Sequence, residues 1–114
     1  MSKNNDIIAT ICEKLRKDTI YEIIVFGSYA QGTADENSDV DIIVVLDRND
    51  IPRSYEEKMQ LRLAIRNQII ELSGLIPIDL LVFTKPEYAS FLQRNSSFAR
   101  EIRETGKVLY EKTG

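Results

Sequence analysis

Two aspartates separated by one residue, Asp39 and Asp41, stand where an apolar run begins that is typical of a strand. Side chains two positions apart on a strand share a face, so these carboxylates should project together, with Cα atoms roughly 6–7 Å apart. A divalent cation between them would relieve their repulsion, and nucleotidyl and phosphoryl transfer commonly use two metal ions about 3.5–4 Å apart. Taken alone, such a pair is more typical of a solvated strand end that caps a turn. Other residues must therefore show whether the pair binds a metal ion.

The second feature is Gly27-Ser28, directly after an apolar, β-branched run. A glycine at that position lets the backbone approach a ligand closely, and the following N–H groups and hydroxyl suit a phosphate chain. Gly32 permits a second tight bend. An ordinary turn is the alternative, and the segment is not a P-loop because no Gly-Lys-Ser/Thr follows.

A third acid, Asp79, lies within the apolar run 76–83, where aspartate is disfavoured. If this run is a strand beside the one that carries Asp39 and Asp41, the three carboxylates can form one cluster. Asp79 is then the best candidate base for an attacking hydroxyl, because the chain has no histidine. The alternative is an aspartate at a solvated strand edge.

Composition limits the other chemistry. With no histidine and one cysteine, Cys12, the chain has neither an internal disulfide nor a zinc site of histidines or cysteines, so any metal must bind oxygen ligands, as magnesium or manganese does. Helical spacing places Cys12 in the core. The net charge of −3 argues against broad nucleic-acid binding. A polar N-terminus and the lack of a membrane-length apolar run predict a cytoplasmic protein without a membrane segment.

Apolar periodicity and capping patterns predict the elements that position these residues. The last helix is expected to bury Phe98 and Ile102. The order predicts an α/β (α+β) fold, a small mixed sheet with helices packed against it, in a single domain over 1–114. The expected elements are a helix at 6–17, a strand at 21–26, a loop with one helical turn at 27–38, a strand at 40–46, a helix between Ser54 and Gly74, a strand at 76–83, a short helix after Thr84, a helix at 97–105 and an edge strand at 108–110.

Other residues are open to two interpretations. Tyr29, beside Ser28, could stack on a base or pack in the core. The arginines of the predicted helices lie off the apolar stripes and are interpreted as solvated helix faces; they are Arg62, Arg66, Arg94, Arg100 and Arg103.

The motif as a whole resembles the signature of the DNA polymerase beta nucleotidyltransferase superfamily, in its minimal nucleotidyltransferase branch. The resemblance covers nearly the whole chain, and in one departure Gln31 stands where relatives often have an arginine. The string Gly-Ser-x-Ala-x-Gly-x-Ala-x-x-x-Ser-Asp-x-Asp is matched by Gly27, Ser28, Ala30, Gly32, Ala34, Ser38, Asp39 and Asp41.

This resemblance implies the polymerase beta-like nucleotidyltransferase fold and a role for each matched residue. Asp39 and Asp41 would ligate two Mg²⁺ ions, and Asp79 would hold the catalytic one and help to deprotonate the acceptor. Gly27 and Ser28 would bind the β- and γ-phosphates of ATP. Ser38 would support the loop or a phosphate. The reaction implied is attack on the α-phosphorus with loss of pyrophosphate.

The acceptor is expected to come from a partner, because few residues of so short a chain remain to build an acceptor pocket. The resemblance implies a small helical HEPN protein, with this chain as the antitoxin of a toxin–antitoxin pair that adenylylates a tyrosine of its partner, in a homo- or hetero-oligomer. Two rival hypotheses stay open. One is a non-catalytic antitoxin that binds nucleotide and neutralises its partner by contact, which Gln31 keeps open. The other is nucleotidyl transfer to a small molecule.

Overall fold

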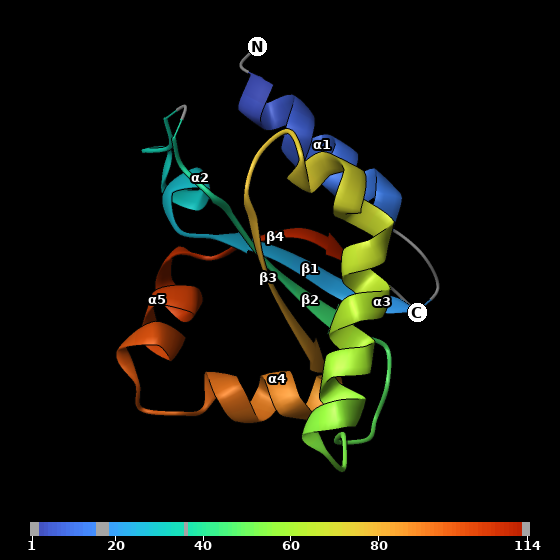
Figure 1. Ribbon diagram of the computed structural model, residues 1–114. Coiled ribbons are helices and arrows are strands. Elements are labelled where there is room, and N and C mark those ends of the chain that lie inside the picture. The colour runs from blue at the N-terminus through green and yellow to red at the C-terminus, as the bar shows by residue number, and fades with distance from the viewer. Residues whose placement is uncertain (1–2, 16–18, 36, 113–114) are drawn as a thin grey trace.

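The computed structural model describes residues 3–15, 19–35 and 37–112, and in it a sheet is packed between helices (Figure 1). The predicted element order is confirmed. The first helix begins three residues before the predicted start at 6, and its predicted end at 17 lies outside the described residues. The elements are α1 (Lys3–Leu15), β1 (Ile20–Phe26), α2 (Ser28–Gln31), β2 (Val40–Leu46), α3 (Tyr55–Ser73), β3 (Ile78–Thr84), α4 (Lys85–Leu92), α5 (Ser97–Thr105) and β4 (Lys107–Glu111).

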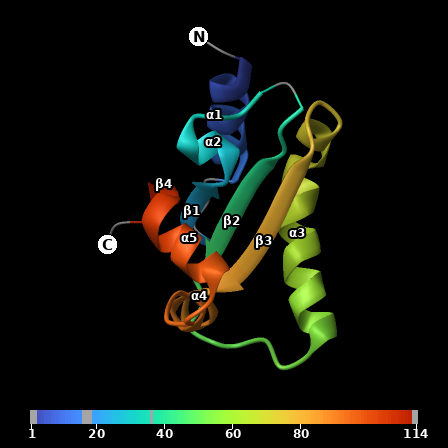
Figure 2. The same ribbon diagram turned by 90° about the vertical axis from the view of Figure 1, so that its left-hand side faces the viewer.

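The four strands form one mixed sheet in the order β3-β2-β1-β4. β1 pairs antiparallel with both β2 and β4, whereas β2 and β3 are parallel and α3 forms the connection between them. In Figure 2, β2 and β3 run side by side with α3 behind them. The strands that carry the predicted carboxylates are therefore neighbours, with β3 at an edge of the sheet.

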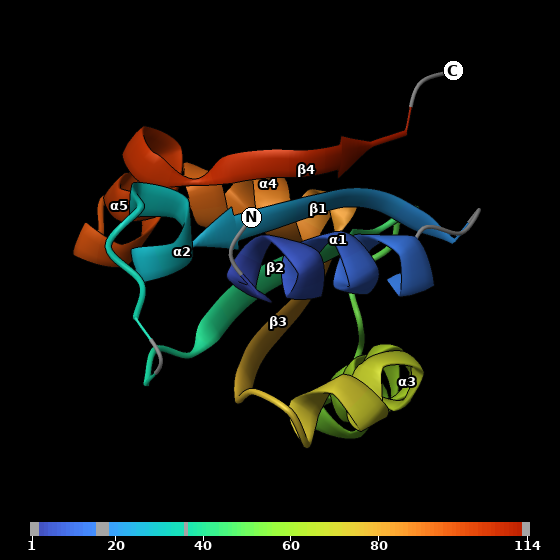
Figure 3. The ribbon, with the colours of Figure 1, turned by 90° about the horizontal axis from the view of Figure 1, so that it is seen from above.

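Helices cover both faces of this sheet, which is why β1 and β2 are apolar at nearly every position. Alternate residues, such as Ile42 and Val44, face α1 and α3, while Ile43 and Val45 face α4 and α5. Figure 3 shows the two pairs of helices on opposite sides of the strands. Cys12 is partly buried against the α1/α3 side of the core, as predicted. None of the helices in the described ranges is long and apolar enough to cross a bilayer.

The capping patterns act largely as predicted. Ser54 accepts the N–H of Glu57 at 3.1 Å, and α3 ends before Gly74. The Glu57 side chain accepts the N–H of Arg53 at 3.3 Å. At the start of α4, the N–H of Thr84 donates to the Glu87 carboxylate at 3.0 Å.

Two expectations about α5 and the arginines need correction. Phe98 is 39% exposed, and Ala99 is buried beside Ile102 instead. The Phe98 ring still packs edge-on against Phe26 and Phe91, with centroids 5.5 and 5.4 Å away, so it lies at the rim of an aromatic cluster. Two of the five arginines are not simply solvated, because they bind backbone carbonyls: Arg62 that of Leu80, and Arg103 that of Leu92.

Candidate active site

The register of β2 and β3 brings the predicted carboxylates to one end of the sheet. Asp41 is paired directly with Asp79 across the parallel strands, so their side chains point to the same face. Asp39 precedes the first residue of β2 and lies two residues from Asp41. That face is the one covered by α4 and α5, because Ile43 packs there. The condition on which Asp79 could join the cluster, adjacency of the two strands, is met.

Asp41 lies in a negative environment of limited solvent access. It is half-buried, whereas Asp39 and Asp79 are exposed. Burial raises the pKa of the Asp41 carboxyl above its usual value, and the nearby carboxylates of Asp79, Asp39 and Glu101 raise that pKa further. Within the described ranges no lysine or arginine forms an ion pair with the three aspartates. The described residues therefore leave the charge of these three carboxylates without an ion-pair partner.

Gly27 is essential to the packing around Asp41. Its φ of 71° lies in the left-handed region, and a Cβ at this position would be 2.2 Å from Oδ2 of Asp41. A larger residue would therefore displace the carboxylate as well as strain the backbone. The sequence predicted close approach of a ligand at Gly27, and the structure shows close approach of the Asp41 carboxylate at the same point.

The turn after Gly27 is the short helix α2. The carbonyl of Gly27 accepts the N–H groups of Ala30 and Gln31, both at 3.1 Å. Ser28 is the first residue of α2 and is half-buried, and the N–H groups of the first two residues of a helix have no carbonyl partner within it. Gly32 ends α2 with a φ of 75° and supplies the predicted second bend. Helix α2 thus begins directly after Gly27, the residue that lies against the Asp41 carboxylate.

Ser38 makes hydrogen bonds that hold the loop before β2. Its Oγ accepts the N–H of Asp35 at 2.9 Å and donates to Oδ1 of Asp35 at 3.2 Å. The N–H of Asn37 donates to the same Oδ1 at 2.9 Å. These bonds correspond to the first of the two roles implied for Ser38, support of the loop that presents Asp39.

Tyr29 packs against the core on the α1/α3 side. Its hydroxyl is buried and has no hydrogen-bond partner among the described residues. Burial raises the pKa of this hydroxyl, and Asp35 and Asp39 raise it further. Of the two interpretations of Tyr29, the structure favours packing.

Helix α5 contributes to the site in a way that the sequence reasoning missed. Glu101 is close enough to Asp41 to raise the pKa of its carboxyl. A hollow of about 310 Å³ lies between α2 and α5, and its lining residues include Gln31, Arg100 and Glu101. The helical period of α5 identifies Ile102 as buried, but only the packing of α5 on the Asp41 face of the sheet reveals that Glu101 is near.

The side chains of Asp39, Asp41 and Asp79 are chemically suited to bind a divalent cation. All the candidate ligands are carboxylate oxygens, which Mg²⁺ prefers, and a cation would relieve the repulsion that raises the pKa of Asp41. Within the described part of the chain, no three side chains of acidic residues, histidine or cysteine already surround a common point at which an ion could bind. The strands bring Asp39, Asp41 and Asp79 to the same end without closing a ligand shell.

Comparison with known proteins decides the family. The model of the nucleotidyltransferase domain family matches residues 6–108. The chain belongs to this family. The resemblance inferred from the motif is thus confirmed, as is the class of enzyme, a nucleotidyltransferase.

Relatives and solved structures agree with this assignment. Two curated proteins of Methanocaldococcus jannaschii are similar: "Putative protein adenylyltransferase MJ0141", 30% identical over 75% of this chain and 82% of that protein, and "Putative protein adenylyltransferase MJ0604", 33% identical over 80% and 79%. A crystal structure of a toxin–antitoxin with AMP-PNP aligns with a TM-score of 0.53 at 21% identity, over 96% of this chain and 74% of that one. The last similarity shows a shared fold, and the predicted fold class is confirmed.

Proposed function

We propose that this nucleotidyltransferase transfers AMP from ATP to a hydroxyl group of a protein, with Mg²⁺ bound by Asp39, Asp41 and Asp79. The observation that carries the proposal is the register that sets Asp41 beside Asp79, directly against the Gly27 turn. The names of the two curated relatives support AMP as the transferred group and a protein as the acceptor. AMP-PNP in the similar solved structure supports ATP as the donor.

Each residue has a distinct task in this proposal. Asp39 and Asp41 would hold two Mg²⁺ ions, and Asp79 would share the catalytic one. Bound magnesium supplies neutralisation of the charge that develops on the phosphate oxygens. Backbone N–H groups at Gly27 and Ser28, with the Ser28 hydroxyl, bind the β- and γ-phosphates at the start of α2. Ser38 fixes the loop that carries Asp39.

The proposed reaction is a single in-line displacement. The acceptor oxygen forms a bond to the α-phosphorus of ATP, while the bond from that phosphorus to the bridging oxygen of the β-phosphate breaks. The hydroxyl proton passes to the carboxylate of Asp79, and pyrophosphate leaves with the bridging oxygen. The exposure of Asp79 suits this task, because the acceptor must reach it from outside the chain.

We infer that the acceptor is a tyrosine of a small helical protein of the HEPN type and that this chain is the antitoxin of the pair. The family resemblance stated from the sequence motif and the toxin–antitoxin in the similar solved structure support this inference. A single nucleotidyltransferase domain over 1–114 accords with a family match that extends over residues 6–108. Such a domain would work as one subunit of a hetero-oligomer.

The test is transfer of label from [α-³²P]ATP to a candidate acceptor, the product of the gene next to that of this chain, with Mg²⁺ present. Label on a tyrosine of that protein, lost with Asp41→Asn, is the expected result. Transfer that persists in Asp41→Asn would refute the assigned site. If label never appears although the two proteins bind each other, a non-catalytic antitoxin is the correct account. Label on an aminoglycoside instead would favour the small-molecule alternative.

A further inference from the structure

Basic side chains of α3 bind the outer edge of β3 at regular intervals. Nζ of Lys58 donates to the carbonyl of Val82 at 2.6 Å, and Nε of Arg62 donates to the carbonyl of Leu80 at 3.2 Å. Four residues along a helix rise about 6 Å, and two residues along a strand rise about 6.6 Å. The two spacings match, so successive basic residues of α3 meet successive outward carbonyls of β3. Occupied carbonyls also protect an edge strand from pairing with another chain.

The next pair in this series, Arg66 and Ile78, is not joined. Arg66 is exposed and has neither an ion pair nor a side-chain hydrogen bond with any described residue. A pocket of about 150 Å³ lies here, and its lining includes Arg62, Arg66, Ser73 and Ile78 but no described acidic residue. Two guanidinium groups four residues apart on a helix repel each other. An anionic group bound between them would relieve that repulsion.

The surface around Arg66 is also apolar, which indicates a protein partner rather than a small ion. Leu63 is 43% exposed and Ile70 is 49% exposed, and they stand three residues before and four residues after Arg66. Residues at these spacings share one side of a helix. An arginine among exposed apolar side chains is typical of the centre of a protein interface. An inorganic anion would gain nothing from Leu63 and Ile70.

This surface lies beside the proposed catalytic end. Asp79 stands between Ile78 and Leu80 on β3, and no described strand pairs with the outer edge of β3. Asp79 faces the α4/α5 side of the sheet, whereas Leu80 faces the α3 side. Arg66 lines a pocket with Ile78 and Leu80, the two neighbours of Asp79 on β3. A protein that presents a hydroxyl to Asp79 at this edge strand would therefore meet Arg66 on the other side of the same strand. Figure 2 shows α3 alongside β3.

We propose that the surface formed by Arg62, Leu63, Arg66 and Ile70 is where the acceptor protein docks, and that an acidic side chain of the acceptor binds between the two arginines. The proposal rests on the proposed function for two claims, that the acceptor is a protein and that its hydroxyl reaches Asp79. Arg66 is a positioning residue in this account, because it holds the acceptor and touches neither ATP nor the metal. The acceptor is thus expected to carry exposed carboxylates near its modified hydroxyl.

The test uses the random copolymer poly(Glu,Tyr) as an acceptor that supplies both carboxylates and tyrosines. Arg66→Glu should lower kcat/KM for the copolymer about tenfold or more, since like charges are juxtaposed, and leave KM for ATP unchanged. Arg66→Lys should retain most of the activity. Arg94→Glu is the matched control, because Arg94 is an exposed arginine on the α4–α5 connection and the change in net charge is the same. Equal losses in Arg66→Glu and Arg94→Glu would overturn the proposal.

A binding measurement separates this proposal from the proposed function. If the wild type labels no protein at all, the proposed function fails, and fluorescence anisotropy of labelled poly(Glu,Tyr) still tests the docking surface. Weaker binding by Arg66→Glu than by wild type and Arg94→Glu is the expected result. Unchanged binding would overturn the proposal. Displacement of the copolymer by inorganic phosphate at constant ionic strength would also overturn it, because the pocket would then be a phosphate site.

Discussion

The two ends of β2 and β3 carry charged residues in opposite arrangements. At the amino ends, Asp39, Asp41 and Asp79 lie together without a described basic partner. At the carboxyl end of β2, Asp47 accepts a hydrogen bond from Lys112 at 2.7 Å and forms an ion pair with Lys85 at 2.9 Å. The same residue type is thus neutralised at one end and left negative at the other.

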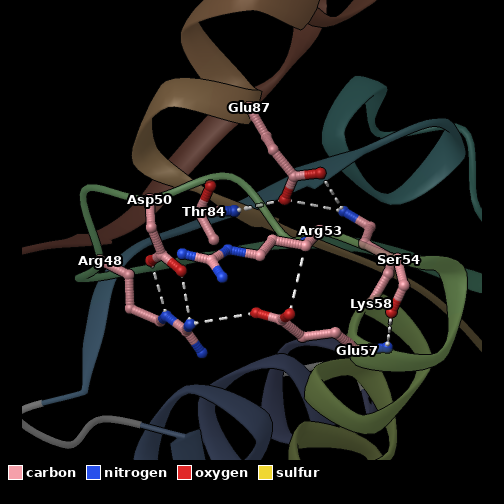
Figure 4. Close-up of polar contacts among 8 residues, drawn as sticks. All are labelled: Arg48, Asp50, Arg53, Ser54, Glu57, Lys58, Thr84 and Glu87. Atoms are coloured by element: carbon pink, nitrogen blue, oxygen red, sulfur yellow. Dashed lines mark hydrogen bonds and ion pairs between the residues drawn. The ribbon is translucent and has the colours of Figure 1, made fainter.

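The carboxyl ends also hold the polar network in Figure 4. Lys58 binds the Glu87 carboxylate at 3.0 Å, and Glu87 in turn accepts the N–H of Thr84. Nearby, Arg48 pairs with Asp50 at 2.6 Å. Each of Arg48, Asp50, Glu57, Lys58 and Glu87 forms an ion pair in this network.

The pKa values show the same contrast. Hydrogen bonds from Lys112 and Lys85 lower the pKa of the Asp47 carboxyl, whereas burial and neighbouring carboxylates raise that of Asp41. A raised carboxyl pKa means that the folded chain disfavours the ionised form. The charged groups at the carboxyl ends are thus paired with opposite charges, whereas those at the amino ends repel one another, as expected of the cation site proposed there.

The largest effect is expected from Asp41→Asn. Loss of one carboxylate from the proposed two-metal site should lower nucleotide transfer about 100-fold or more, because the charge on the reacting phosphate would be less well neutralised. The unfolding temperature measured in EDTA should not fall, since the change removes repulsion from Asp79 and Asp39. If Asp41→Asn kept its activity but unfolded at a lower temperature than wild type, Asp41 would contribute to stability, as Asp47 does, and not to catalysis.

Gly27→Ala should be the most destabilising change at the amino ends. The new Cβ would meet Oδ2 of Asp41 in a left-handed backbone conformation, so we expect a loss of about 2–3 kcal/mol in the free energy of unfolding, measured by urea denaturation. In an Asp41→Ala background, the contact with the carboxylate is absent and the cost should fall to about 1–2 kcal/mol. An equal cost in both backgrounds would show that the clash with Asp41 is unimportant.

Lys58→Met should lower stability without lowering activity, because it changes the carboxyl ends of β2 and β3 and leaves the amino ends unchanged. It removes the bonds to Glu87 and to the carbonyl of Val82 while keeping the apolar stem, and should cost about 1–3 kcal/mol of unfolding free energy. Transfer activity should remain close to wild type, because Lys58 lies at the far end of β3 from Asp79. Activity assays below the unfolding transition check this, and a loss as large as that of Asp41→Asn would contradict the separation.

The smallest effect is expected in the pH dependence of stability when Asp47 is replaced by asparagine. A lowered pKa in the folded state gives a stabilisation that is present above the unfolded pKa of Asp47 and is lost as pH falls through the folded value. Thermal unfolding from about pH 6 to pH 2 should therefore show a slightly smaller decrease for Asp47→Asn than for wild type. Identical pH profiles would mean that Lys85 and Lys112 contribute nothing through Asp47.

Local patterns were sufficient to predict most of the fold. The β-branched runs of β1 and β2, the capping serine at Ser54 and the glycine at Gly74 act through neighbours in sequence, and all lie where they were predicted. The Gly27 turn and the Asp39/Asp41 pair are local in the same sense. These features are fixed by backbone sterics and side-chain period, which a single sequence displays.

The remaining features depend on contacts between distant segments. Asp79 could join the site only if β3 paired with β2, which the sequence left conditional. Glu101 near Asp41 and Arg62 on the carbonyl of Leu80 both follow from where helices pack on the sheet. Phe98 was expected to be buried because it is apolar and one turn from Ile102, yet the edge of the aromatic cluster leaves it exposed.

The central claim, that the amino ends of β2 and β3 await a cation and nucleotide, is tested most directly by thermal unfolding with ATP in Mg²⁺ or in EDTA. Wild type should unfold several degrees higher with Mg²⁺ and ATP, because ligands that bind the folded state stabilise it. The Lys58→Met variant should have a lower unfolding temperature in EDTA than wild type, but Mg²⁺ and ATP should raise that temperature by the same amount. The double variant Asp39→Asn/Asp41→Asn should show no rise in unfolding temperature. An equal rise in the double variant would contradict the account, because Mg²⁺ and ATP would then bind without the two carboxylates.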